Sequence, residues 1–272
     1  MQSFERNLAD YTQNYLNADY MQFENVLVFM RRKKVLEILN QYRPKNILEI
    51  GAGTQSLFDF YHDFESFTVV EPSLEFFKNI QQSSFYNPQK ITLIHDFLEK
   101  QIEKLKTKSF DCIILSSLLH EIPEPIEFLK LVHSLCNPNT ILHVNVPNNQ
   151  SLHLLWAVEA GLLPKVGDLT PTAQKMQQFQ TFNLKTLTIT LDSAGFAPIR
   201  GGGGGKLFSQ TLQPSQNAAV ARRKNHRRSA FERPLFLNAL FPRKRRGSLC
   251  ELHHQTITDF QKNKRLTVDF HG

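Results

Sequence analysis

The apolar residues of this chain follow two different periods, and the two periods alternate along most of its length. Short apolar runs that end at an acidic residue, a serine or a proline predict buried strands, and apolar residues three or four apart predict helices. The expected strands cover residues 46–50, 68–71, 91–95, 111–115 and 140–146, with a further strand starting at 196–200. The expected helices cover residues 5–41, 54–63, 73–82, 126–136 and 184–194.

This alternation predicts an α/β fold with a doubly wound, mostly parallel sheet and helices on both faces. In such sheets, ligands bind beyond the carboxyl ends of the strands. Polar residues with useful chemistry stand at the expected strand ends, so they should gather at one edge of the sheet. They are Glu49, Glu71, Asp96, Ser116 and Asn145.

The most informative stretch is Asn46 to Gln55, in which a strand ends in Glu49 and then turns at Gly51 and Gly53. Glycines at this spacing let the backbone approach a nucleoside-bearing ligand. The third glycine of a dinucleotide fingerprint is absent, because Ser56 stands at that position. A ligand without phosphates does not need it.

Glu71 supports a nucleoside ligand, because an acid about 20 residues after the first strand is placed to bind ribose hydroxyls. Together these residues resemble the first two motifs of the class I S-adenosylmethionine-dependent methyltransferases, and residues 109–122 resemble a later motif. Gln55 stands where that family often has another glycine. The resemblance spans about residues 20–212 and implies a Rossmann-like methyltransferase with S-adenosylmethionine as cofactor.

The resemblance also implies a role for each residue that matches a family motif. Glu49, Gly51 and Gly53 would hold the methionine end of the cofactor, and Glu71 would accept hydrogen bonds from the ribose. The remaining cofactor contacts would be Asp96 at the adenine amino group, Phe97 against the adenine ring, and Ser116 and Ser117 near the sulfonium.

Three histidines are candidates for a general base, which methyl transfer needs only when the nucleophile carries a proton. His120 directly follows the fourth expected strand and is the strongest candidate. His153 begins the insertion over residues 150–182 and is a weaker one. His143 lies inside the fifth strand, where a core role fits better. Each of these histidines could also be purely structural.

The acceptor is expected to be a small molecule or a saccharide, methylated at oxygen rather than carbon. The Asn/Asp-Pro-Pro-Tyr/Phe loop, which the resemblance associates with methylation of nucleic-acid bases, is absent. In the branch that the chain resembles most, the insertion over residues 150–182 caps the acceptor site. Its apolar residues could line that site or simply pack the cap; they are Leu154, Leu155, Trp156 and Met176.

The helical pattern before the first strand and the change in charge near the C-terminus divide the chain into an N-terminal helical segment (1–45), a domain that resembles a methyltransferase (46–212) and a basic tail (213–272). Residues 201–272 hold 14 Lys and Arg against 4 Asp and Glu, whereas the rest holds 18 against 21. The tail could bind nucleic acid, dock on an anionic membrane, or result from a reading-frame change. An RNA-directed methyltransferase and a non-catalytic nucleoside-binding protein therefore remain alternatives.

The bulk composition favours a cytoplasmic protein without a metal centre. The 272 residues include three widely spaced cysteines, with no paired-ligand spacing. No apolar stretch is long enough for a membrane-spanning helix, and the first residues lack the build of a signal peptide. Neither the acceptor's identity nor the oligomeric state follows from the sequence.

Overall fold

A computed structural model describes residues 7–16, 18–204 and 207–215 of the chain. The chain divides into two compact units, Met1–Arg223 and Lys224–Gly272, and all described residues belong to the first. The basic clusters of the tail lie outside the described residues. The predictions about the tail's partners therefore stay predictions.

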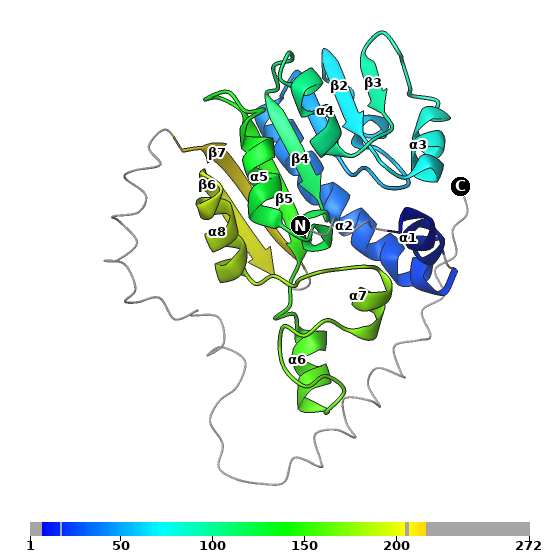
Figure 1. Cartoon of the computed structure of the whole chain (residues 1–272), viewed down its shortest axis with the longest axis vertical. Coiled ribbons are helices and arrows are strands. Elements are labelled where there is room, and N and C mark those ends of the chain that lie inside the picture. Colours follow the sequence, from blue (N-terminus) through cyan, green and yellow to red (C-terminus); the bar gives the residue numbers. More distant parts are fainter. Residues whose placement is uncertain (1–6, 17, 205–206, 216–272) are drawn as a thin grey trace, which may run out of the picture. The chain divides into compact units, whose positions relative to one another are not determined.

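A seven-stranded sheet forms the centre of the described residues, with the strand order β3-β2-β1-β4-β5-β7-β6 (Figure 1). The first five strands pair in parallel, and β7 is antiparallel to both of its neighbours. Because the chain winds outward from β1 in both directions, β1 and β4 form the switch point. The predicted doubly wound α/β fold is confirmed. The strands are β1 (Asn46–Ile50), β2 (Ser66–Val70), β3 (Ile91–Ile94), β4 (Cys112–Ser116), β5 (Ile141–Pro147), β6 (Phe196–Gly204) and β7 (Leu207–Pro214).

Helices cover both faces of the sheet because successive strand residues point to opposite sides. In β1, Leu48 and Ile50 pack toward α4, α5 and α8, whereas Ile47 packs toward α2, α3 and the short 3-10 helix η1. None of the described helices is long and apolar enough to cross a membrane. The helices are α1 (Leu8–Tyr15), α2 (Ala18–Tyr42), η1 (Leu57–Asp59), α3 (Leu74–Gln81), α4 (Leu98–Leu105), η2 (Leu119–Glu121), α5 (Pro125–His133), α6 (Leu152–Glu159), α7 (Pro171–Lys175) and α8 (Leu184–Ser193).

Two expected helices differ from the structure. The helix expected over 5–41 is two helices, α1 and α2, and α1 lies beside the start of α3, where Thr12 hydrogen-bonds Ser73. The helix expected over 54–63 is wrong, because only the single turn of η1 forms there. The buried carboxylate of Glu49 binds the hydroxyl of Ser56 and the backbone N–H of Leu57. These bonds, together with several buried aromatic rings, hold the segment in an irregular path. The rings are Phe58, Tyr61 and Phe64.

Other boundaries follow local chemistry that the sequence displays. Ser73 caps α3, with its hydroxyl accepting a hydrogen bond from the N–H of Phe76 at 3.4 Å. Gly195 ends α8 with a φ of +90°. Helix α4 was not predicted, although Leu98, Ile102 and Leu105 carry the helical spacing and are buried.

The glycine run at 201–205 does not end the fold, because β6 continues through Gly204. The glycines from 201 to 204 pair with β7, so they belong to the sheet although they have no side chains to pack. The sheet therefore closes with an antiparallel hairpin that reaches Pro214.

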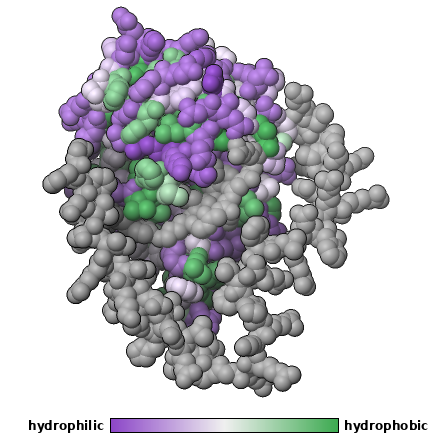
Figure 2. Space-filling view, turned by 180° about the vertical axis from the view of Figure 1, so that it is seen from behind, coloured by the Kyte–Doolittle hydropathy of each residue, from purple (hydrophilic) through white to green (hydrophobic). Residues whose placement is uncertain are grey.

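On the face that Figure 2 shows, the described residues are mainly hydrophilic, with scattered apolar patches. Among the exposed apolar side chains are Phe29, Phe85, Trp156 and Leu162. Single exposed residues of this kind are normal.

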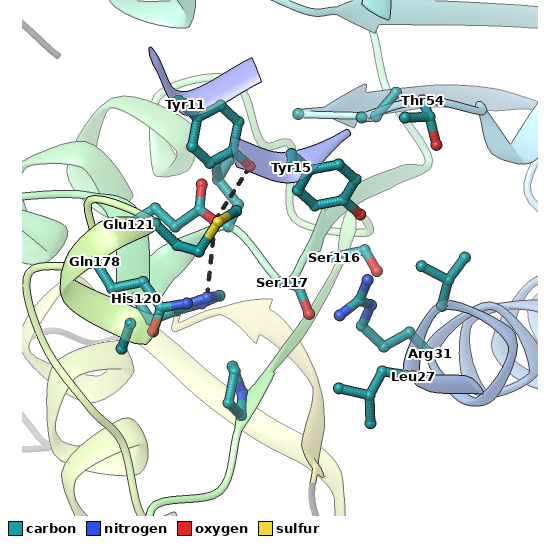
Figure 3. Close-up of a pocket in the computed structure, with 18 of the residues that line it drawn as sticks. Tyr11, Tyr15, Leu27, Arg31, Thr54, Ser116, Ser117, His120, Glu121 and Gln178 are labelled. Carbon is teal, nitrogen blue, oxygen red and sulfur yellow. Dashed lines mark hydrogen bonds and ion pairs between the residues drawn. The ribbon is translucent and has the colours of Figure 1, made fainter. Parts of the chain in front are cut away.

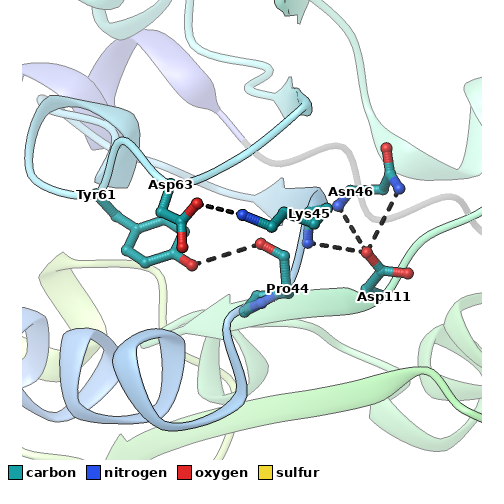
Figure 4. A network of polar contacts seen from close by, with 6 residues as sticks. All are labelled: Pro44, Lys45, Asn46, Tyr61, Asp63 and Asp111. Atoms are coloured by element: carbon teal, nitrogen blue, oxygen red, sulfur yellow. Dashed lines mark hydrogen bonds and ion pairs between the residues drawn. The ribbon is translucent and has the colours of Figure 1, made fainter.

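Asp111 fixes the edge of the sheet opposite the carboxyl ends of the strands (Figure 4). Its Oδ2 accepts the backbone N–H groups of Lys45 and Asn46 at 2.9 and 2.8 Å. The backbone N–H of Asp111 in turn donates to the carbonyl of Asn46 at 2.8 Å. This clamp aligns the start of β1 with the start of β4. It thereby sets the relative height at which the two strands end.

We expect Asp111→Ala to lower the free energy of unfolding by about 2–3 kcal/mol, because two backbone donors lose their acceptor. Asp63→Ala is the matched control, since Asp63 also contacts Lys45, but through an exposed ion pair. Such pairs contribute roughly 0–1 kcal/mol. Urea unfolding of the two variants measures the difference. An equal loss of unfolding free energy in both would show that the Asp111 clamp stabilises the fold no more than an exposed ion pair does.

Candidate active site

The carboxyl ends of β1, β2, β4 and β5 converge on a cavity of about 510 Å³ (Figure 3). Glu49, Gly51, Gly53 and Glu71 all line it, as the sequence predicted. Parallel pairing brings them together, because Ile50 lies beside Val70 in the sheet. The switch point of the sheet therefore opens directly into this cavity.

The glycine turn forms the floor of the cavity. Gly51 and Gly53 have φ values of +71° and +70°, a region that side chains with a β-carbon rarely adopt. A β-carbon on Gly51 would lie 3.2 Å from Leu118 Cδ1, whereas one on Gly53 would meet nothing within 4 Å. Gly53 thus leaves bare backbone beside open space, which is the cradle that a nucleoside ligand needs.

Glu71 ties this turn to the second strand. Its Oε2 accepts the N–H of Gly53 at 2.9 Å, and its Oε1 accepts the N–H of Ser73 at 2.9 Å. The side chain is 4% exposed and lines the cavity. The position of this carboxylate at the cavity is compatible with the predicted ribose contacts.

Glu49 is the second buried acid of the site, and only 3% of it is exposed. Burial raises the pKa of Glu49 to about 7, and the nearby charge of Glu71 adds to this shift. Hydrogen bonds from Ser56 and from the backbone of Leu57 oppose it. The carboxyl therefore titrates near neutral pH.

The end of β4 contributes Ser116 and Ser117, which both line the cavity. Ser117 has a φ of +55°, an unusual value for a residue with a side chain. The amide of Asn145 on β5 holds both serines: its Nδ2 donates to Ser116 Oγ at 3.1 Å, and its Oδ1 accepts from Ser117 Oγ at 3.2 Å. Strain at Ser117 is thus supported by a buried partner, as is common at functional sites.

His120 lies in the cavity wall beside a buried acid. Its Nε2 is 3.9 Å from Glu121 Oε1, and the hydroxyl of Tyr11 donates to the same oxygen at 3.2 Å (Figure 3). His120 and Glu121 are only 4% and 8% exposed. Helix α1 therefore completes a histidine–carboxylate–tyrosine cluster that is assembled from two parts of the chain, α1 and η2.

The cap contributes some of its predicted residues to the cavity. His153, Leu154 and Met176 line it, and Ser151 hydrogen-bonds His153 Nδ1 at 3.0 Å. Leu155 and Trp156 are 40% and 67% exposed and are not among the lining residues. They cover the outside of the cap instead.

The structure does not bring Asp96 and Phe97 into the cavity lining. Asp96 accepts hydrogen bonds from Gln101 and from the backbone of Phe97, which lower the pKa of Asp96. His143 is fully buried in β5, where it contacts Thr211 at 3.4 Å. Burial lowers the pKa of His143 to about 4, so it stays neutral at physiological pH.

Sequence reasoning missed the contribution of the N-terminal helices. Within the basic run from 31 to 34, Arg31 and Arg32 line the cavity, whereas Lys33 and Lys34 are exposed. The relevant signal was the helical spacing of one face of α2, Leu27, Val28, Arg31 and Arg32. The aromatic residues Tyr11, Tyr15 and Phe76 form a second wall that had no sequence signature.

Comparison with known proteins identifies the family. Residues 24–200 match the family model described as a methyltransferase domain, so the chain belongs to that methyltransferase family. No curated protein sequence matches the chain. The predicted class I S-adenosylmethionine-dependent methyltransferase is confirmed, with S-adenosylmethionine as cofactor.

Solved structures with the same fold have little sequence in common with this chain. The plantazolicin methyltransferase BamL superposes with a TM-score of 0.55 at 10% identity, over 76% of this chain and 97% of that one. The N-methyltransferase NodS from Bradyrhizobium japonicum WM9 gives 0.54 at 10% identity, over 77% and 99%. The mitomycin 7-O-methyltransferase MmcR gives 0.53 at 10% identity over 76% of this chain, which spans only 60% of that enzyme.

The residues at the glycine turn fit the cofactor. The open space at Gly53 and the two-point anchoring of Glu71 form a rigid cradle with an acid at its edge. The cavity is large enough for a nucleoside and part of an acceptor, since ligand pockets usually measure about 300–1,000 Å³.

We expect Glu71→Gln to weaken binding of S-adenosylhomocysteine about 30-fold or more, because charge-assisted hydrogen bonds contribute about 1.5–3 kcal/mol each. Glu75→Gln on the exposed face of α3 is the control and should bind like the unaltered chain. Isothermal titration calorimetry measures both affinities. Unchanged affinity in Glu71→Gln would exclude Glu71 from the cofactor site.

We also expect Glu49 to make stability depend on pH. Its pKa is raised from 4.5 to about 7 by folding. The stability that it contributes is therefore full below pH 4.5 and is lost as pH rises through about 7, an effect on the order of 3 kcal/mol. Glu49→Gln should lack this loss. Urea unfolding of the two proteins at several pH values tests this, and parallel curves would contradict it.

Proposed function

We propose that this methyltransferase acts on a hydroxyl oxygen of a small-molecule or saccharide acceptor, with His120 as the general base. The observation that carries the proposal is the cluster of His120, Glu121 and Tyr11 in the cavity wall. A hydroxyl loses its proton during methylation, so it benefits from a base, whereas a neutral amine attacks through its lone pair.

Each residue of this cluster has a distinct task. When bound, S-adenosylmethionine would supply the methyl group, which its sulfur would release as the acceptor oxygen takes it up. His120 accepts the proton that the acceptor hydroxyl releases. Glu121 stabilises the imidazolium that results, and Tyr11 holds the Glu121 carboxylate in place through its 3.2 Å hydrogen bond. The buried setting strengthens these charge interactions and excludes water.

The walls of the cavity support a small acceptor. Helices α1 and α3 contribute an aromatic wall, with the rings of Tyr15 and Phe76 edge to face at 5.4 Å. The cap adds apolar Leu154 and Met176. Polar cap residues also line the cavity and would suit an acceptor with several hydroxyl groups; they are Thr170, Thr172, Gln178, Gln180 and Thr181.

The fold by itself does not choose the methylated atom, since an O-methyltransferase and an N-methyltransferase both share it. A direct test uses methyl-labelled S-adenosylmethionine and pairs of acceptors that differ only in carrying a hydroxyl or an amine. Total RNA is included in the same panel. We expect label on the hydroxyl compounds, and label on amines or RNA alone would reject the proposal. No transfer to any acceptor would favour the non-catalytic alternative.

With the acceptor that this panel identifies, we expect His120→Ala to lower kcat about 10²–10⁴-fold, as loss of a general base usually does. Glu121→Gln should lower kcat less and move the acid limb of the pH–kcat profile to lower pH, because the imidazolium loses its neighbouring carboxylate. His153→Ala is the matched control and should retain most of kcat.

Steady-state kinetics across pH measure these effects. A His120→Ala variant that raises the KM for the acceptor while keeping kcat and the acid limb would assign His120 to packing.

A further inference from the structure

The loop that follows the glycine turn is held at two points by buried carboxylates. Glu71 binds the N–H of Gly53, and Glu49 binds the hydroxyl of Ser56 and the N–H of Leu57. Thr54 and Gln55 lie between these anchors, and both line the cavity. Gln55 is the exposed residue of this loop.

Arg32 of α2 contacts the same loop through a hydrogen bond and a cation–π contact. Its Nη2 donates to Gln55 Oε1 at 2.9 Å, and its guanidinium carbon lies 3.7 Å from the centroid of the Phe60 ring. Partial burial lowers the pKa of Arg32, while the charges of Asp59 and Glu49 oppose that shift. A guanidinium stays charged under such conditions. Arg32 therefore combines a charge-assisted hydrogen bond with a cation–π contact.

These contacts join two walls of the cofactor cavity. Besides Arg32, α2 presents Leu27, Val28 and Arg31 to the cavity, and the loop presents Gly53, Thr54 and Gln55. A ligand seated on the glycine turn would therefore lie beside both walls. The residue that joins them occupies the position where the resembled family often has glycine, which has no side chain to accept the bond.

We propose that Arg32 and Gln55 form a latch that holds α2 against the glycine turn and slows release of the bound nucleoside cofactor. The latch concerns retention of the cofactor and does not depend on the identity of the acceptor. Arg32 and Gln55 are positioning residues, because they act through the wall and the loop. Since lid opening and product release often limit turnover, such a latch would also influence the rate of the whole cycle.

The test measures the dissociation rate of S-adenosylhomocysteine from the immobilised full chain by surface plasmon resonance. Arg32→Met and Gln55→Ala should each raise this rate about three- to tenfold, as expected for one partly exposed polar contact. Arg32→Lys, which keeps the charge but not the planar fork, should give an intermediate rate. The double variant should exceed neither single variant by much, because both remove the same latch.

Lys33→Met is the matched control, since it removes an adjacent exposed charge from the same helix and should leave the rate unchanged. Gln55 is exposed, so Gln55→Ala keeps the test decisive even where Arg32→Met lowers the melting temperature. A Gln55→Ala rate equal to that of the unaltered chain would overturn the proposal. Fully additive effects of Arg32→Met and Gln55→Ala would also overturn it, because the two residues would then act separately.

Discussion

Two carboxylates withdrawn from water, Glu49 and Glu71, hold the glycine turn in the shape that the rest of the site requires. Each one accepts two donors from the segment between Gly53 and Ser73, so their desolvation is offset by hydrogen bonds. The same bonds replace the helix that the sequence pattern favoured after β1. The cost of this arrangement appears at Glu49, whose pKa is raised to about 7 by burial and by its acidic neighbour.

The amino ends of β1 and β4 stabilise the sheet, and their carboxyl ends form the candidate site. At one edge, Asp111 clamps the starts of β1 and β4 through backbone donors. At the other edge, the same two strands end in the glycine turn and in the strained Ser117, which Asn145 supports. A fixed start for both strands is what makes their ends meet with the accuracy that methyl transfer needs, since positioning supplies much of its rate enhancement.

The N-terminal helices α1 and α2 form walls of the cavity at the carboxyl ends of the strands. Helix α1 carries Tyr11 to Glu121 and packs Tyr15 against Phe76, and α2 carries Arg32 to the glycine turn. The proposed latch and the proposed base cluster thus each include a residue from an element that precedes the first strand. Segments outside the glycine turn therefore form a large part of the cavity wall.

The sequence by itself predicted the five parallel strands and the convergence of Glu49, Gly51, Gly53 and Glu71 at their carboxyl ends. These features depend on local chemistry: strand length, glycine at positive φ, and acids at strand ends. It did not determine the irregular segment after β1, the exposure of Trp156, or the meeting of Tyr11, His120 and Glu121. Tyr11 and Glu121 are 110 positions apart, and no local pattern encodes a contact of that range. Only the tertiary structure decided those features, because packing of α1 and the cap across the sheet edge selects which side chains face the cavity.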